Sequence, residues 1–166
     1  MNVNKLARCA VLTALALALS MAERFLPLTV LIPLPGLRLG LANLVTVFAL
    51  CRMSGREAVL ILIARCVLGS IGGGMLTSLA FSLTGGLLAL GIMALMLRCR
   101  RLSLIGVCMA GAAAHNVGQI LAAVWVLGSP APVVYLPALL AASVLTGGVT
   151  GAVSILLVHR VPLKKS

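Results

Sequence analysis

Long apolar stretches alternate along the chain with short segments that are basic or rich in proline and glycine. A helix needs about 20 mainly apolar residues to cross a bilayer, so this alternation predicts membrane-spanning helices. It predicts six of them, over residues 9–26, 39–51, 57–71, 75–97, 103–127 and 133–158. Hydrophobic residues make up 62% of the 166, which leaves no room for a soluble domain. We expect one all-α transmembrane domain over residues 1–166.

The second and third predicted helices are short for membrane spans, at about 20–23 Å by the rise of 1.5 Å per residue. A re-entrant hairpin is the alternative, but it would bury the charged turn RMSGRE, residues 52–57, in the bilayer. We therefore expect two short spans whose connection reaches the cytoplasm. Residues 27–38 hold three prolines and predict an outer loop, and the short spans predict a depression in the outer surface.

Ten of the 13 lysines and arginines fall at one set of helix ends. By the positive-inside rule these ends are cytoplasmic, and so are both termini. The ten are residues 5, 8, 52, 56, 98, 100, 101, 160, 164 and 165. Their positions explain the net charge of +11 as a topology signal, so we expect no nucleic-acid partner.

Lys5 and Arg8 precede the first apolar stretch, which could therefore be a cleavable signal peptide with a site near SMAE, residues 20–23. We expect the helix to be retained, because it makes the topology of the later spans consistent. Alanines recur in it at every fourth residue, and the ridge of small side chains suits close helix packing. Ala10, Ala14 and Ala18 would pack either inside this bundle or against a partner subunit.

Polar residues interrupt the fifth apolar stretch in GAAAHNVGQ, residues 111–119. His115 and Gln119 share a helix face at i and i+4, with Asn116 beside them, so the three form one patch. Polar groups inside a bilayer are costly unless they face a cavity or a partner. The surrounding glycines and alanines would let another helix or a ligand come close.

Three basic residues are not explained by topology: Arg24 and Arg38 at the outer mouth, and Arg65 within the third predicted span. Arg65 lies about 13–14 Å along its helix and His115 about 18 Å along its own, so both fall near the bilayer midplane. Arg65 could bind a ligand shared with His115, or hydrogen-bond only to helix carbonyls, Asn116 or Gln119. Arg38 at the outer mouth completes the candidate binding site. Asn43 is a weaker candidate, and a hydrogen bond to neighbouring backbone is its alternative role.

The chain contains no aspartate, and Glu23 and Glu57 are its two acidic residues. Diphosphate chemistry assisted by Mg²⁺ would need clustered carboxylates, and ATP hydrolysis a phosphate-binding loop, so we expect neither catalysis nor a cofactor. The histidines and five cysteines have no metal-ligand spacing, and we expect no metal site and no disulfide. We also expect no carboxylate to reach Arg65, and hence a ligand that supplies an anion.

Five segments together resemble the family called Gx transporters, which is also labelled heptaprenyl diphosphate synthase component I. They are GLRLGLANLVTVFAL (36–50), the R-x-x-x-G-S-x-G-G pattern that begins at Arg65, SLTGGLLAL (82–90), GAAAHNVGQ (111–119) and LPALLAASVLTG (136–147). The resemblance implies a six-helix bundle similar to the S components of energy-coupling-factor transporters. Those bacterial proteins of the cytoplasmic membrane capture small molecules from outside and dock through their first helix onto a coupling subunit driven by two ATPase subunits. The second family label implies a different role, as a non-catalytic membrane component of heptaprenyl diphosphate synthesis.

Overall fold

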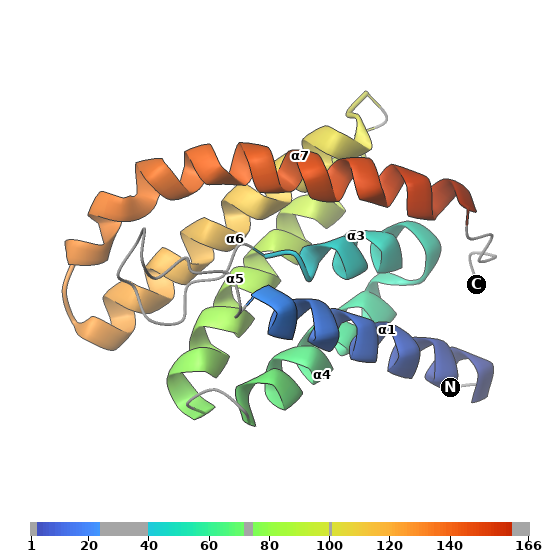
Figure 1. Ribbon diagram of the computed structural model, residues 1–166, viewed down its shortest axis with the longest axis horizontal. Coiled ribbons are helices and arrows are strands. Elements are labelled where there is room, and N and C mark those ends of the chain that lie inside the picture. Colours follow the sequence, from blue (N-terminus) through green and yellow to red (C-terminus); the bar gives the residue numbers. More distant parts are fainter. Residues whose placement is uncertain (1–2, 24–39, 72–74, 100, 161–166) are drawn as a thin grey trace.

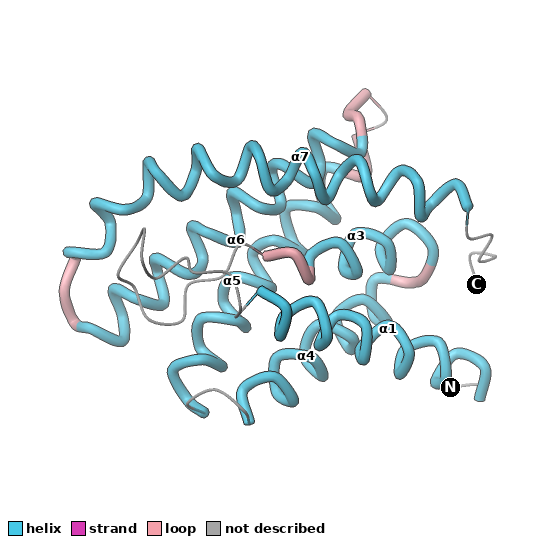
Figure 2. Tube along the Cα trace, in the orientation of Figure 1, coloured by secondary structure: helices cyan, strands magenta, loops and turns pink. Residues whose placement is uncertain are grey.

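The computed structural model describes residues 3–23, 40–71, 75–99 and 101–160, and these are all helical or in short turns (Figures 1 and 2). The predicted outer loop at 27–38, with Arg38, lies outside the described residues. The described residues form six α-helices, as the sequence predicted, although only four of the helical segments are long and apolar enough to be membrane spans. The six helices are α1 (Val3–Ala22), α3 (Asn43–Arg52), α4 (Gly55–Ile71), α5 (Met75–Met96), α6 (Leu104–Leu127) and α7 (Leu136–Arg160). The largest difference is at the first helix, which begins at Val3 rather than near residue 9.

Within the described residues, four segments are long and apolar enough to cross a membrane: Val3–Ala22, Leu76–Met96, Leu104–Leu127 and Ala131–Arg160. The last includes a 3-10 turn, η2 (Ala131–Tyr135), that leads into α7. The helices α3 and α4 are shorter, at 10 and 17 residues. By helix length and hydropathy the chain is a multi-pass membrane protein.

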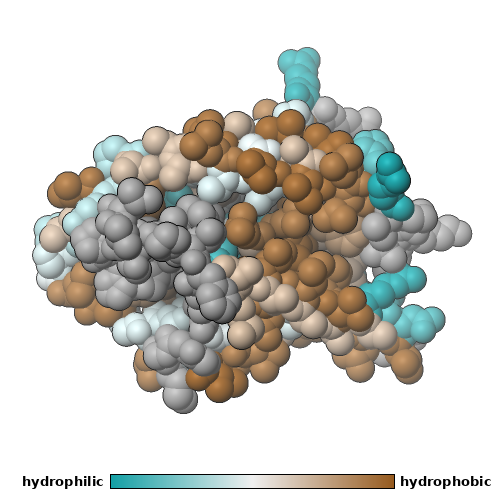
Figure 3. Space-filling model, in the orientation of Figure 1, coloured by the Kyte–Doolittle hydropathy of each residue, from teal (hydrophilic) through white to brown (hydrophobic). Residues whose placement is uncertain are grey.

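Hydrophobic side chains cover much of the visible face of the molecule, and hydrophilic ones gather at the end where α1 begins and α7 ends (Figures 1 and 3). Arg52, at the end of α3, donates a hydrogen bond to the carbonyl oxygen of Val158 near the end of α7. The turn between α3 and α4 therefore lies at this same basic end.

A capping box begins α4. The carboxylate of Glu57 accepts hydrogen bonds from the backbone N–H of Ser54 at 2.8 Å and from its hydroxyl at 3.0 Å, and the Ser54 hydroxyl accepts from the Glu57 N–H at 3.3 Å. These bonds satisfy the first amides of the helix. Glu57 is thereby held at the start of α4.

The helices α5, α6 and α7 form the most closely packed part of the bundle. Glycines allow this close packing. A β-carbon at Gly147 of α7 would lie 2.4 Å from the Cα of Met109 on α6, and one at Gly151 would lie 2.7 Å from the Cα of Ile105. By contrast, α1 contacts α4 and α3 and no other described element. It is a peripheral helix of the bundle.

Candidate functional site

The polar patch predicted on α6 is buried. His115, Asn116 and Gln119 have exposed fractions of 2%, 1% and 0%. The side-chain amide of Asn116 donates to the carbonyl oxygen of Leu139 on α7 at 2.8 Å. One member of the patch therefore ties α6 to α7 inside the bundle.

His115 packs against two glycines on other parts of the chain. A β-carbon at Gly85 of α5 would lie 3.0 Å from the imidazole Nδ1, and one at Gly40 would lie 3.2 Å from Cδ2. Gly40 precedes α3 and has a φ of +81°, a conformation that favours glycine. The imidazole is thus enclosed where the start of α3 and the middle of α5 meet α6.

Asn43 joins His115 at this point. A β-carbon at Gly40 would also lie 2.8 Å from Nδ2 of Asn43, so both side chains face the same glycine. Asn43 is buried, and neither polar atom of its side chain has a hydrogen-bond partner among the described residues. The backbone hydrogen bond considered as its alternative role is not formed there. An amide buried in this way retains its capacity to bind a ligand.

Arg65 approaches the next glycine along α5. A β-carbon at Gly86 would lie 3.3 Å from Nη2 of Arg65, directly beside the glycine that contacts His115. Gly85 and Gly86, which are adjacent on α5, thus contact His115 on α6 and Arg65 on α4, respectively. The two polar side chains therefore lie at similar heights along α5. The Nη1 atom of Arg65 donates to the hydroxyl of Ser20 on α1 at 3.4 Å.

A carboxylate lies close enough to Arg65 to act on it electrostatically, which the sequence did not lead us to expect, although it forms no hydrogen bond with Nε or Nη2 of Arg65. Glu23 follows Ser20 by less than one turn, is only 3% exposed, and interacts electrostatically with Arg65. Its carboxylate accepts a hydrogen bond from the backbone N–H of Leu41, just before α3. The sequence suggested a residue at the outer surface, but this contact draws Glu23 into the bundle. The charge of Arg65 is partly balanced, while its Nε and Nη2 have no hydrogen-bond partner among the described residues.

A narrow crevice lies between the start of α3 and the helices α5, α6 and α7, whereas the outer depression expected above the short helices would border residues 24–39, outside the described residues. Gly40, Asn43, Met93, Cys108, Ala112, Thr146 and Thr150 line the crevice. It does not admit a water molecule. A larger cavity, of about 400 Å³, lies elsewhere, between α1, α3 and α7.

The alanine ridge of α1 faces outward. Ala10, Ala14 and Ala18 are exposed, whereas Cys9, Thr13, Ala16 and Ser20 form the buried face of the helix. Packing inside the described bundle therefore does not account for the ridge.

Sequence reasoning missed several residues that shape the polar cluster: Ser20, Glu23, Gly40, Gly85 and Gly86. The adjacent glycines in the middle of a span were the available signal, because they leave α5 without side chains where its neighbours are polar. Among the described residues, no three His, Cys, Asp or Glu side chains are grouped to hold a metal ion.

Comparison with known protein families places the chain in a family. The family model described as heptaprenyl diphosphate synthase component I aligns with residues 12–157, most of the chain. Searches of curated proteins and of solved structures give no match.

Proposed function

The chain belongs to the heptaprenyl diphosphate synthase component I family, and we propose that it is the substrate-binding membrane subunit of an energy-coupling-factor-type importer. Its cargo is a small molecule that carries a carboxylate or a phosphate. The ligand binds at the cluster formed by Asn43, Arg65 and His115, together with Asn116 and Gln119 on the same helix as His115. Arg38 is proposed to line the outer approach.

The observation that carries this proposal is the buried guanidinium of Arg65. Two of its three nitrogens have no hydrogen-bond partner among the described residues, although burial makes unpaired donors costly. A ligand oxyanion would accept these hydrogen bonds with the strength of charge-assisted pairs. Glu23 does not meet this need, because its carboxylate accepts from the N–H of Leu41 and forms no hydrogen bond with Nε or Nη2 of Arg65.

Asn43 and His115 give the site a second, uncharged side. Both face Gly40, and Asn43 offers a free donor and a free acceptor within the described part of the chain. Because the crevice beside Asn43 does not admit water, α3 must move away from α6 and α7 for a ligand to enter. We therefore propose that binding is coupled to a displacement of this short helix.

The partners proposed are a membrane coupling subunit and its two ATPase subunits. Support comes from the exposed alanines of α1, which present almost no side-chain bulk to an approaching helix. Transport energy would have to come from these partners, since the chain has no phosphate-binding loop of its own.

Native mass spectrometry of the purified protein tests the ligand proposal. We expect a small anionic molecule to be retained by the wild type and by Arg98→Gln, a change at an exposed arginine, and to be lost from Arg65→Gln. Retention of a neutral or cationic molecule, or equal retention by both variants, would contradict the proposal.

A second function is favoured by the description of the family itself. We propose as the alternative that the chain is a non-catalytic membrane component of heptaprenyl diphosphate synthesis. It could not supply the metal-binding aspartates of such a synthase, because it has none. Co-purification with a soluble prenyl synthase whose product length or activity depends on this chain would favour the alternative, and co-purification with ATPase subunits would favour import.

A further inference from the structure

We propose that the cavity between α1, α3 and α7 binds one acyl chain of an anionic phospholipid, with the lipid phosphate at Arg8. This site is separate from the polar cluster and does not depend on the function proposed above. Its volume of about 400 Å³ lies within the range of specific ligand sites.

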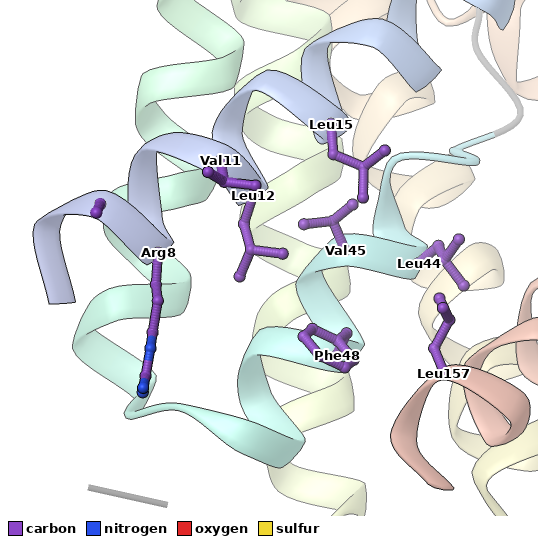
Figure 4. A pocket seen from close by; sticks show the side chains of 9 residues that line it. Arg8, Val11, Leu12, Leu15, Leu44, Val45, Phe48 and Leu157 are labelled. Carbon is purple, nitrogen blue, oxygen red and sulfur yellow. The ribbon is translucent and has the colours of Figure 1, made fainter. Parts of the chain in front are cut away.

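The walls of the cavity suit an alkyl chain. Arg8 contributes the charged group of the lining, and the other side chains that form it are apolar: Ala7, Val11, Leu12, Leu15, Leu44, Val45, Phe48 and Leu157 (Figure 4). Val45 and Phe48 of α3 are buried and form the floor, whereas Val11 and Leu15 of α1 are 68% and 47% exposed at the edge. Since α1 and α7 do not contact each other, the space between them is not closed by helix packing.

The length of the cavity fits one leaflet. The lining residues of α1 extend from position 7 to position 15, about 12 Å along the helix axis. This is less than half of the hydrocarbon thickness of about 30 Å, so a single chain from one side of the bilayer would fill it.

Charge identifies the headgroup. Lys5 and Arg8 lie close enough to the start of α4 to act electrostatically on Glu57, and Arg52 lies at the other side of the same turn. Glu57 is held by its capping hydrogen bonds, so this end of the molecule carries an excess of positive charge beside the mouth of an apolar cavity. Clusters of this kind next to a membrane attract anionic lipid headgroups.

The test uses the full-length protein in lipid nanodiscs that contain a phosphatidylglycerol with a photoactivatable group in its acyl chain. We expect adducts on the lining peptides of α1 and α3. Val11→Trp, which fills the cavity from an exposed position, should abolish them. Leu145→Trp, at a residue of α7 that is 74% exposed and outside the cavity, should leave them unchanged.

A second arm tests the phosphate. Arg8→Gln should reduce the preference for phosphatidylglycerol over the matching phosphatidylcholine probe by about fivefold, the effect of one basic residue at an anionic surface. Arg98→Gln, at the exposed end of α5, should not. The proposal is overturned if adducts spread equally over the outer helix faces, if Val11→Trp leaves the labelling intact, if both headgroups label alike, or if a co-purifying subunit occupies the cavity and excludes the probe.

Discussion

Gly118 of α6 lies directly against Gly85 of α5, so closely that a β-carbon on Gly118 would be 2.7 Å from the Cα of Gly85. This approach of the two backbones brings the imidazole of His115, one turn earlier on α6, onto the same part of α5. Two small residues are required, because a methyl group on either one would meet backbone atoms. The position of the polar cluster therefore depends on this pair.

Gly118→Ala should destabilise the protein by about 1–3 kcal/mol, the usual cost of overpacking, because the new methyl group has no flexible neighbour to displace. Gly91→Ala, on α5 with nothing within 4 Å of its added carbon, should be neutral or slightly stabilising. Thermal unfolding in a mild detergent measures both. Equal stability of the two variants would show that α5 and α6 are not packed at Gly118.

Arg65→Gln should weaken binding of the anionic ligand by more than tenfold, about 1.4 kcal/mol, because it removes the charge that the ligand meets. Arg65→Lys should restore only part of the affinity, since an ammonium group lacks the planar set of donors. Isothermal titration with the ligand recovered from the native protein measures these changes. An unchanged affinity in Arg65→Gln, at normal expression, would leave Arg65 with a structural role alone.

Glu23→Gln should act in the opposite direction. The amide oxygen can still accept the hydrogen bond from Leu41, but the negative charge near Arg65 is gone. The anionic ligand should bind about fivefold more tightly, which corresponds to roughly 1 kcal/mol of repulsion removed. Weaker binding in this variant would indicate that Glu23 contacts the ligand as an acceptor or that the ligand is a cation.

Ala14→Leu should abolish association with the coupling subunit while leaving the subunit folded, because it adds bulk to an exposed ridge that needs close approach. The same substitution at Ala141, an exposed alanine of α7, serves as the matched control and should have no effect. Affinity purification followed by size-exclusion chromatography reads out both complex and fold. If Ala14→Leu aggregates when Ala141→Leu does not, the ridge packs within the protein.

Cys99 reports the orientation of the chain in the membrane. It is exposed at the turn between α5 and α6, a turn that the basic residues assign to the cytoplasm. A membrane-impermeant maleimide should label it only after cells are permeabilised, and Cys99→Ser should remove that labelling. Labelling of intact cells would invert the proposed topology, in which both termini are cytoplasmic.

The sequence by itself determined the six helices and their approximate limits. This was possible because the length and hydropathy of a span are local properties, and breakers such as proline, glycine and arginine mark its ends. It also determined that His115, Asn116 and Gln119 share one face, since a helix fixes the spacing of its own side chains. The alanine ridge followed for the same reason, but its outward orientation did not.

Only the tertiary structure decided which residues of different helices meet. Glu23 is 42 positions from Arg65 along the chain, and nothing in the local pattern around either one placed its charge near the other. The same holds for Gly40 and Asn43 against His115, and for Leu157 of α7 at the wall of the cavity beside α1. In a bilayer, apolar helix faces gain little by turning away from lipid, so hydropathy does not indicate which face packs inside. Close approach of backbones and the pairing of buried polar groups make that choice, and both are properties of the assembled bundle.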